Sequence, residues 1–267
     1  MGKIITGKNK VKFEIQNKKD CILYLGHVIE YIEKKRDIYW RLSLEPLRYL
    51  AYELNEREIY IESDEKALKF IMEKMDTDFN FDLDFYKFKL FHSAINLIKN
   101  EMINIIGDFS VDKLAISYNN YLDIIRKEDI EGVKYEYSSE KEKLIDSFTA
   151  HRNFLYHFSS DKLCEWIEFR ERQAKQNKNA RFEMGKEFNI YVSDTIPYKV
   201  FAKEIIKNIA FLEEIDKVIN FMKKDFESLI GEKVTFNINR KSFDNSVKDI
   251  TYNGFKSHNL SRKRKNK

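Results

Sequence analysis

The chain has 267 residues, of which 43% are hydrophobic and 34% are charged, and it contains only 8 glycines and 2 prolines. This composition is typical of a globular protein and argues against collagen-like, linker-like and turn-rich β architectures. The net charge of +4 is uneven, because residues 255–267 carry six basic side chains and no acid. The first 254 residues are therefore close to neutral, and the chain ends in a cationic tail.

We expect neither a membrane-spanning segment nor a secretory signal. No apolar run approaches the roughly 18 residues that a spanning helix needs, and residues 1–19 lack a continuous apolar segment. The two cysteines, Cys21 and Cys164, lie far apart and outside any Cys-x-x-Cys pattern, which argues against a disulfide framework and a cysteine-based zinc site. We expect a cytoplasmic protein with no membrane partner.

The first quarter of the chain is predicted to be mixed but mostly helical. Residues 11–15 alternate like a short strand, and residues 58–61 alternate briefly and are predicted to pair with it. Apolar residues recur at three and four positions from Cys21 onwards, which predicts a helix. Pro46 is then expected near the start of another helix, ahead of a second apolar stripe.

Further helices are predicted over residues 64–75, 84–106 and 111–126. The helix over 84–106 has an almost continuous apolar stripe, and Gly107 is expected to end it. Residues 127–138 form a polar loop. The next helix begins at a predicted capping box, in which Ser139 caps the backbone and Glu142 reaches back to it.

The longest predicted helix begins after Asp194, Thr195 and Pro197 and ends at Gly231. The fold class is therefore mainly α, an irregular bundle of about seven or eight helices with a small β element. Three segments are expected: residues 1–83, mostly helical and without an assigned role; residues 84–231, a helical bundle; and residues 232–267, a polar segment ending in a basic tail that we expect to be disordered.

Common enzyme motifs are missing or broken. Residues 2–9 nearly spell a phosphate-binding loop, but Asn9 replaces the required Ser or Thr and no strand precedes the segment. The serine-hydrolase elbow, the zinc-protease pair of histidines and the dinucleotide-binding glycines do not occur. We expect neither a cofactor nor a metal.

One polar group interrupts the apolar helix that follows residue 139. Arg152, Asn153 and His157 lie within six residues, and Asn153 and His157 share a helical face at a spacing of four. Arg152 can bind a phosphate and stabilise negative charge in a transition state. His157 can move a proton near neutral pH. This set suits cleavage of a phosphodiester without a metal.

The segment resembles the signature of the HEPN ribonucleases, which is Arg, then four to six residues, then His, often with Asn, Asp or His directly after the Arg. Here it reads Arg152-Asn153-x-x-x-His157. The resemblance implies a helical bundle over residues 84–231 and a homodimer through the motif-bearing helices. It also implies metal-independent RNA cleavage by the 2′-hydroxyl, with Arg152 and His157 catalytic and Asn153 supporting. Many members are similar to toxins or abortive-infection effectors, which implies an antitoxin or activator as a partner.

Three other interpretations stay open. The three polar residues could have a structural role, as ion-pair or hydrogen-bonding groups within the bundle. The chain could be a non-catalytic HEPN-like module that binds RNA, a nucleotide or a protein. A third hypothesis is a DNA-associated factor. It uses the basic tail, whose possible nucleic-acid contacts are Arg262, Lys263, Arg264 and Lys265.

Overall fold

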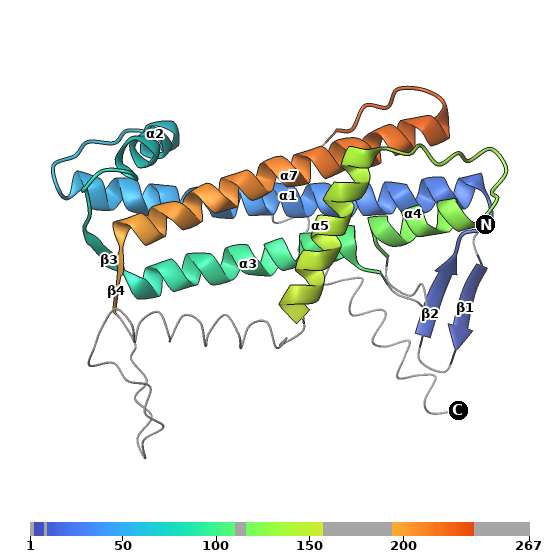
Figure 1. Ribbon diagram of the computed structural model, residues 1–267, viewed down its shortest axis with the longest axis horizontal. Coiled ribbons are helices and arrows are strands. Elements are labelled where there is room, and N and C mark those ends of the chain that lie inside the picture. The colour runs from blue at the N-terminus through green and yellow to red at the C-terminus, as the bar shows by residue number, and fades with distance from the viewer. Residues whose placement is uncertain (1–2, 8–9, 110–115, 157–193, 238–267) are drawn as a thin grey trace, which may run out of the picture. The chain divides into compact units, whose positions relative to one another are not determined.

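Figure 1 shows the computed structural model of the chain, which describes residues 3–7, 10–109, 116–156 and 194–237. The predicted fold class is confirmed at the level of a mainly helical protein, with six helices and two small β ribbons in the described part. The described residues up to 232 form one compact unit. Within the described ranges, no helix is both long enough and apolar enough to cross a membrane.

The first helix, α1 (Lys18–Asn55), is longer than the sequence predicts. Asn17 caps it by accepting a hydrogen bond from the Asp20 N–H at 3.1 Å. Pro46 lies inside this helix and does not start a new one, so that prediction was wrong. Proline in a helix interior removes one backbone hydrogen bond. The buried side chains on both sides of Pro46, which face the core, stabilise the continuous helix.

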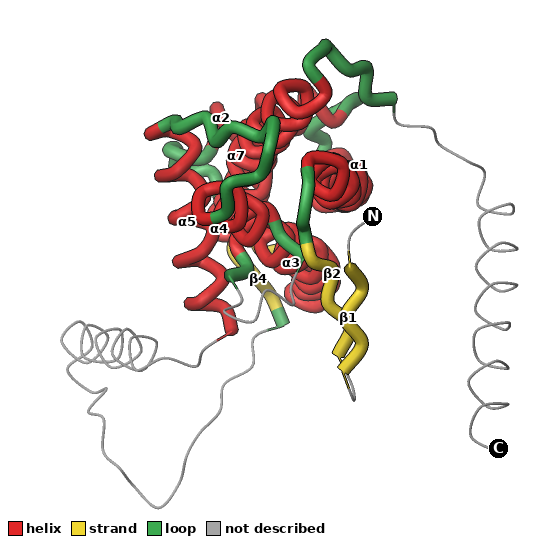
Figure 2. Tube along the Cα trace, turned by 90° about the vertical axis from the view of Figure 1, so that its right-hand side faces the viewer, coloured by secondary structure: helices red, strands yellow, loops and turns green. Residues whose placement is uncertain are grey.

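Three long helices pack along one another (Figures 1 and 2). The helix α1 lies against α3 (Phe85–Gly107) and along α7 (Tyr198–Ile230), and the short helix α2 (Asp64–Lys74) packs on α1. Helices on both sides of residue 84, the predicted segment boundary, share one buried core. Its fully or almost fully buried members include Leu47, Leu50, Leu54, Ala67, Ile71, Leu83, Ile196, Tyr198, Phe201 and Ile205.

The ends of these helices agree closely with the sequence. Asp84 caps α3 by accepting a hydrogen bond from the Lys87 N–H at 3.0 Å. Gly107 is the last residue of α3, as expected. Gly231 ends α7 in the left-handed conformation with a φ of 87°, which glycine adopts without steric cost.

The strands differ from the prediction. Strand β1 (Lys3–Gly7) pairs with β2 (Lys10–Glu14) as an antiparallel hairpin, so the predicted pairing of residues 11–15 with 58–61 was wrong. Residues 58–61 form no strand, because the Asn55 side chain accepts a hydrogen bond from the Ile61 N–H at 2.7 Å and turns the chain back onto the end of α1.

A second ribbon joins the starts of α3 and α7. Strand β3 (Asp82–Asp84) pairs antiparallel with β4 (Thr195–Pro197), and their central residues are buried. Pro197 therefore caps α7 from the end of a strand. Strands of three residues are too short to show a hydrophobic period, so the sequence pattern could not predict them.

The last two described helices, α4 (Tyr118–Lys127) and α5 (Ser139–Tyr156), begin at positions shifted from the prediction. Ser117 caps α4, which begins at Tyr118, and the predicted helix start at residue 111 lies outside the described residues. Ser138, not Ser139, caps α5 by accepting a hydrogen bond from the Lys141 N–H at 3.3 Å. The Glu142 side chain is engaged with Arg126. The reciprocal half of the predicted capping box is therefore not formed.

The helices α3 and α5 approach closely at Gly107. A Cβ atom added at this position would lie 2.8 Å from the backbone carbon of Phe148 and 2.8 Å from the backbone nitrogen of Thr149. Backbone atoms of a packed helix cannot move aside as a flexible side chain does. Gly107 therefore sets how near α5 can come to the end of α3.

We expect Gly107→Ala to lower the free energy of unfolding by about 1–3 kcal/mol, because the added methyl group overpacks a backbone contact. Chemical denaturation measures the change. Gly26→Ala in α1 is the matched control, since its Cβ would meet only the Phe226 side chain, at 3.3 Å, and alanine favours a helix. If the two variants prove equally stable, the close approach at Gly107 does not constrain α5.

Candidate functional site

Two of the three predicted catalytic residues are described, at the C-terminal end of α5. The Arg152 Nη2 atom lies 2.8 Å from Oδ1 of Asp108, and its Nη1 atom donates a hydrogen bond to Oδ1 of Asn153 at 3.2 Å. The side chain of Arg152 is 28% exposed, and Asn153 is exposed. The structure thus brings Arg152 and Asn153 together at a partly open position. His157 and the basic residues 262–265 lie outside the described residues.

Asp108 belongs to a well-fixed corner between α3 and α4. It caps the C-terminus of α3, and its backbone carbonyl accepts a hydrogen bond from the Ser117 hydroxyl. The buried Tyr24 hydroxyl in turn accepts from the Ser117 N–H at 2.9 Å and donates to the Ser117 carbonyl at 3.1 Å. Burial raises the pKa of Tyr24 to about 12, so this hydroxyl stays protonated. Arg152 is therefore anchored to a corner fixed by α1, α3 and α4.

A pocket opens between α3, α5 and α7, directly beside the motif. Its volume is about 190 Å³. His151, the residue before Arg152, belongs to its lining, and the sequence assigned no role to this residue. The full lining consists of Lys99, Ser147, Phe148, His151, Lys207, Ala210, Phe211 and Glu214.

The pocket lining carries two lysines, one histidine and one carboxylate, Glu214. Lys99 places its Nζ atom 4.6 Å from the centre of the Phe211 ring, and burial lowers the pKa of Lys99. Burial also lowers the pKa of His151, and the nearby charge of Lys99 adds to the effect. Lys207 donates to Glu204 at 2.6 Å. Two ammonium groups and an imidazole therefore lie around one small cavity, and these groups favour anions.

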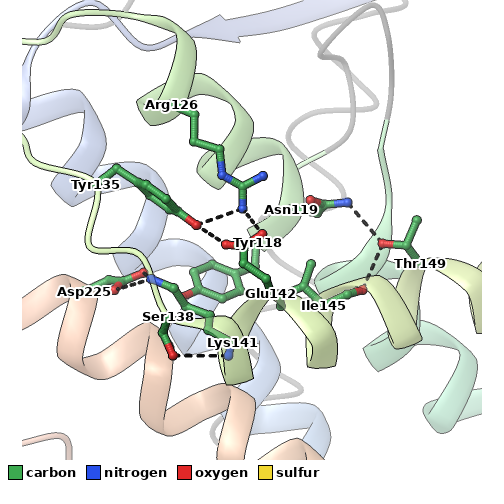
Figure 3. Close-up of polar contacts among 10 residues, drawn as sticks. All are labelled: Tyr118, Asn119, Arg126, Tyr135, Ser138, Lys141, Glu142, Ile145, Thr149 and Asp225. Carbon is green, nitrogen blue, oxygen red and sulfur yellow. Dashed lines mark hydrogen bonds and ion pairs between the residues drawn. The ribbon is translucent and has the colours of Figure 1, made fainter.

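The opposite end of α5 is held by a buried ion pair (Figure 3). The Lys141 Nζ atom lies 3.1 Å and 3.3 Å from the two carboxylate oxygens of Asp225 in α7, and the exposed fractions of the two side chains are 2% and 11%. Tyr118 donates to the same carboxylate at 2.6 Å. Burial raises the pKa of Asp225, although the hydrogen bonds from Tyr118 and Lys141 oppose this shift.

A second layer of polar contacts extends this cluster towards solvent (Figure 3). Arg126 of α4 pairs with Glu142 of α5 and also donates to the Tyr135 hydroxyl at 3.0 Å. About two helical turns further along α5, the Asn119 amide donates to the Thr149 hydroxyl at 3.1 Å. These contacts fix α5 against α4 and α7, and so fix the direction in which its motif-bearing end points.

Sequence reasoning missed both the pocket and the buried ion pair. The sequence around Lys99, Lys141 and Asp225 does not set them apart from the other charged residues of their helices, and only the helix packing distinguishes them. No group of three or more His, Cys, Asp or Glu side chains suited to a metal occurs in the described part of the chain. Neither a protein-family model, nor a curated protein, nor a solved structure matches the chain.

We expect Lys141→Met to lower the free energy of unfolding by about 3–5 kcal/mol, because it leaves the Asp225 carboxylate buried without its cation. Adding Asp225→Asn should recover most of this loss, since the amide is neutral and still accepts a hydrogen bond from Tyr118. Lys143→Met, at an exposed position of the same helix, is the control. Urea denaturation of the four proteins measures the effects. If Lys141→Met alone proves as stable as Lys143→Met, the buried ion pair does not hold α5.

Proposed function

We propose that the chain is a metal-independent endoribonuclease of the HEPN type, acting as a toxin or as an antiviral effector of the abortive-infection kind. The motif that supports this proposal is Arg152-Asn153-x-x-x-His157. Two further features agree with it: the mainly helical fold and the position of Arg152 and Asn153 on α5, a helix packed against α3 and α7.

The arrangement of Arg152 is the observation that carries the proposal. Asp108 and Asn153 contact its two terminal nitrogens and orient the guanidinium, while part of the side chain stays exposed. Beside it lies the pocket with Lys99, His151 and Lys207. A preoriented guanidinium next to further cationic groups suits the binding of a phosphodiester and the stabilisation of charge on its oxygens.

In the proposed reaction, the ribose 2′-hydroxyl attacks the adjacent phosphorus and the bond to the 5′-oxygen of the next nucleotide breaks. The products are a 2′,3′-cyclic phosphate and a 5′-hydroxyl. Arg152 stabilises the negative charge that develops on the phosphate oxygens. His157 moves the proton as a general acid or base, and Asn153 orients Arg152. The exposed residues His151 and Asn153 of α5 lie on the surface through which two copies would form the proposed homodimer.

We expect Arg152→Ala and His157→Ala each to reduce cleavage of RNA by at least about 100-fold, because each removes a group that acts on the scissile phosphate. The assay uses purified protein in excess EDTA. Arg41→Ala and His27→Ala, at exposed positions of α1, are the matched controls and should cleave like the parent.

Two results would contradict this assignment. Cleavage by either motif variant at the rate of the parent would show that the residue is not catalytic. If the parent cleaves RNA without EDTA but not in excess EDTA, the reaction needs a metal ion.

The ion pair between Arg152 and Asp108 favours a second candidate, a helical module that binds RNA without cutting it. A guanidinium that joins the end of α3 to α5 has a structural role of its own. RNA binding without turnover, unchanged by His157→Ala, would favour this candidate. A large loss of thermal stability in Arg152→Ala, matched by Asp108→Asn, would also favour it.

A further inference from the structure

The pocket between α3, α5 and α7 has chemistry that the catalytic motif does not use. Its charged lining includes Lys99 and Lys207, with Glu214 as the one carboxylate of the lining. Among the described residues, no carboxylate lies within 4.0 Å of the Lys99 Nζ atom, whereas Lys207 pairs with Glu204. A partly buried lysine without an ion-pair partner in this part of the chain is suited to an anion from solution.

The pKa values of Lys99 and His151 agree with this interpretation. Burial lowers the pKa of Lys99, and burial together with the charge of Lys99 lowers the pKa of His151. Burial thus disfavours the charged forms of both side chains, although the charge of Glu214 opposes this. An anion bound beside them would favour the charged forms.

The size and walls of the pocket indicate which anion fits. Its volume of about 190 Å³ is many times the roughly 10–15 Å³ that a single buried water needs. Phe148 and Phe211 supply apolar surface to the pocket, and the Lys99 Nζ atom lies 4.6 Å from the centre of the Phe211 ring. A phosphate with part of its sugar suits a pocket that offers both ammonium groups and apolar surface.

The position of the pocket relates it to the motif. His151 lines the pocket, and the next residue, Arg152, turns to Asp108. Successive residues of an α-helix project about 100° apart. Two phosphates of one RNA strand could therefore contact neighbouring faces of the same end of α5, one at Arg152 and the other in the pocket.

We propose that Lys99, His151 and Lys207 form a subsite that binds a backbone phosphate of RNA next to the scissile phosphate at Arg152. This inference rests on the proposed function for the identity of the ligand. The subsite positions the strand by its backbone and reads no base, since phosphate contacts carry no direct sequence information.

The test measures the binding of a single-stranded 2′-O-methyl RNA, which has no free 2′-hydroxyl and so cannot be cut by the proposed reaction. Lys99→Gln with Lys207→Gln should weaken binding by about tenfold or more. The slope of log affinity against log salt should fall by about 0.7, the value for one phosphate contact on a single strand. Lys66→Gln with Lys69→Gln, on the exposed face of α2, removes the same charge and should leave affinity and slope unchanged.

Lys207→Gln alone controls for a loss of folding, because the Lys207 side chain is 67% exposed and its replacement should not disturb the core. This variant should lose less RNA affinity than the double variant. Equal affinity for the pocket variant and the α2 variant would overturn the subsite. So would a pocket variant that loses binding of inorganic phosphate but still binds the RNA like the parent, since the site would then serve free phosphate.

The two proposals fail separately. A parent protein that never cleaves RNA, but whose binding of the 2′-O-methyl strand depends on the pocket lysines, would refute the nuclease and support the subsite. A parent that cleaves through Arg152 and His157, with no effect of the pocket lysines on binding, would support the nuclease and refute the subsite.

Discussion

The contact between α3 and α5 at Gly107 determines where the candidate site lies. The backbone of α5 at Phe148 and Thr149 passes so close to Gly107 that no side chain fits between the helices. Asp108 follows Gly107 directly and caps α3, and Arg152 lies one turn beyond the contact on α5. The same approach therefore brings the carboxylate and the guanidinium within 2.8 Å of each other and leaves the end of α5 partly exposed.

The opposite end of α5 is fixed by electrostatics. Lys141 and Asp225 form an ion pair that is almost entirely buried, and Tyr118 supplies a further hydrogen bond to the carboxylate. Such a pair adds little net stability relative to an apolar pair, but breaking it leaves an uncompensated buried charge. Any other placement of α5 on α7 would separate Lys141 from Asp225 and leave a buried charge without a partner. One helix is thus held by close backbone packing at one end and by a directional ion pair at the other.

The sequence predicted the parts of the fold that depend on long periodic patterns. The helices over residues 64–74, 85–107 and 198–230 appear close to their predicted limits, because each has an apolar stripe of several turns and a clear cap or stop. Pro46 was misassigned because burial on both sides keeps α1 continuous through it. The β3–β4 ribbon was missed because three residues show no period.

The candidate site was predictable only as far as the motif in the sequence. Arg152 and Asn153 were selected because polar residues are unusual in an apolar helix, and the structure places them side by side. Asp108 and Lys99 could not be assigned in this way. Their surroundings depend on contacts between helices far apart in the chain, which local patterns do not encode.

The central claim is that a ribose 2′-hydroxyl attacks a phosphate held at Arg152. The most direct measurement compares the cleavage, in EDTA, of an RNA strand with that of a copy in which every 2′-hydroxyl is replaced by hydrogen. The account predicts that the RNA is cut to products ending in a 2′,3′-cyclic phosphate and that the deoxy copy stays intact. Cleavage of the deoxy copy, or RNA products without the cyclic phosphate, would contradict it.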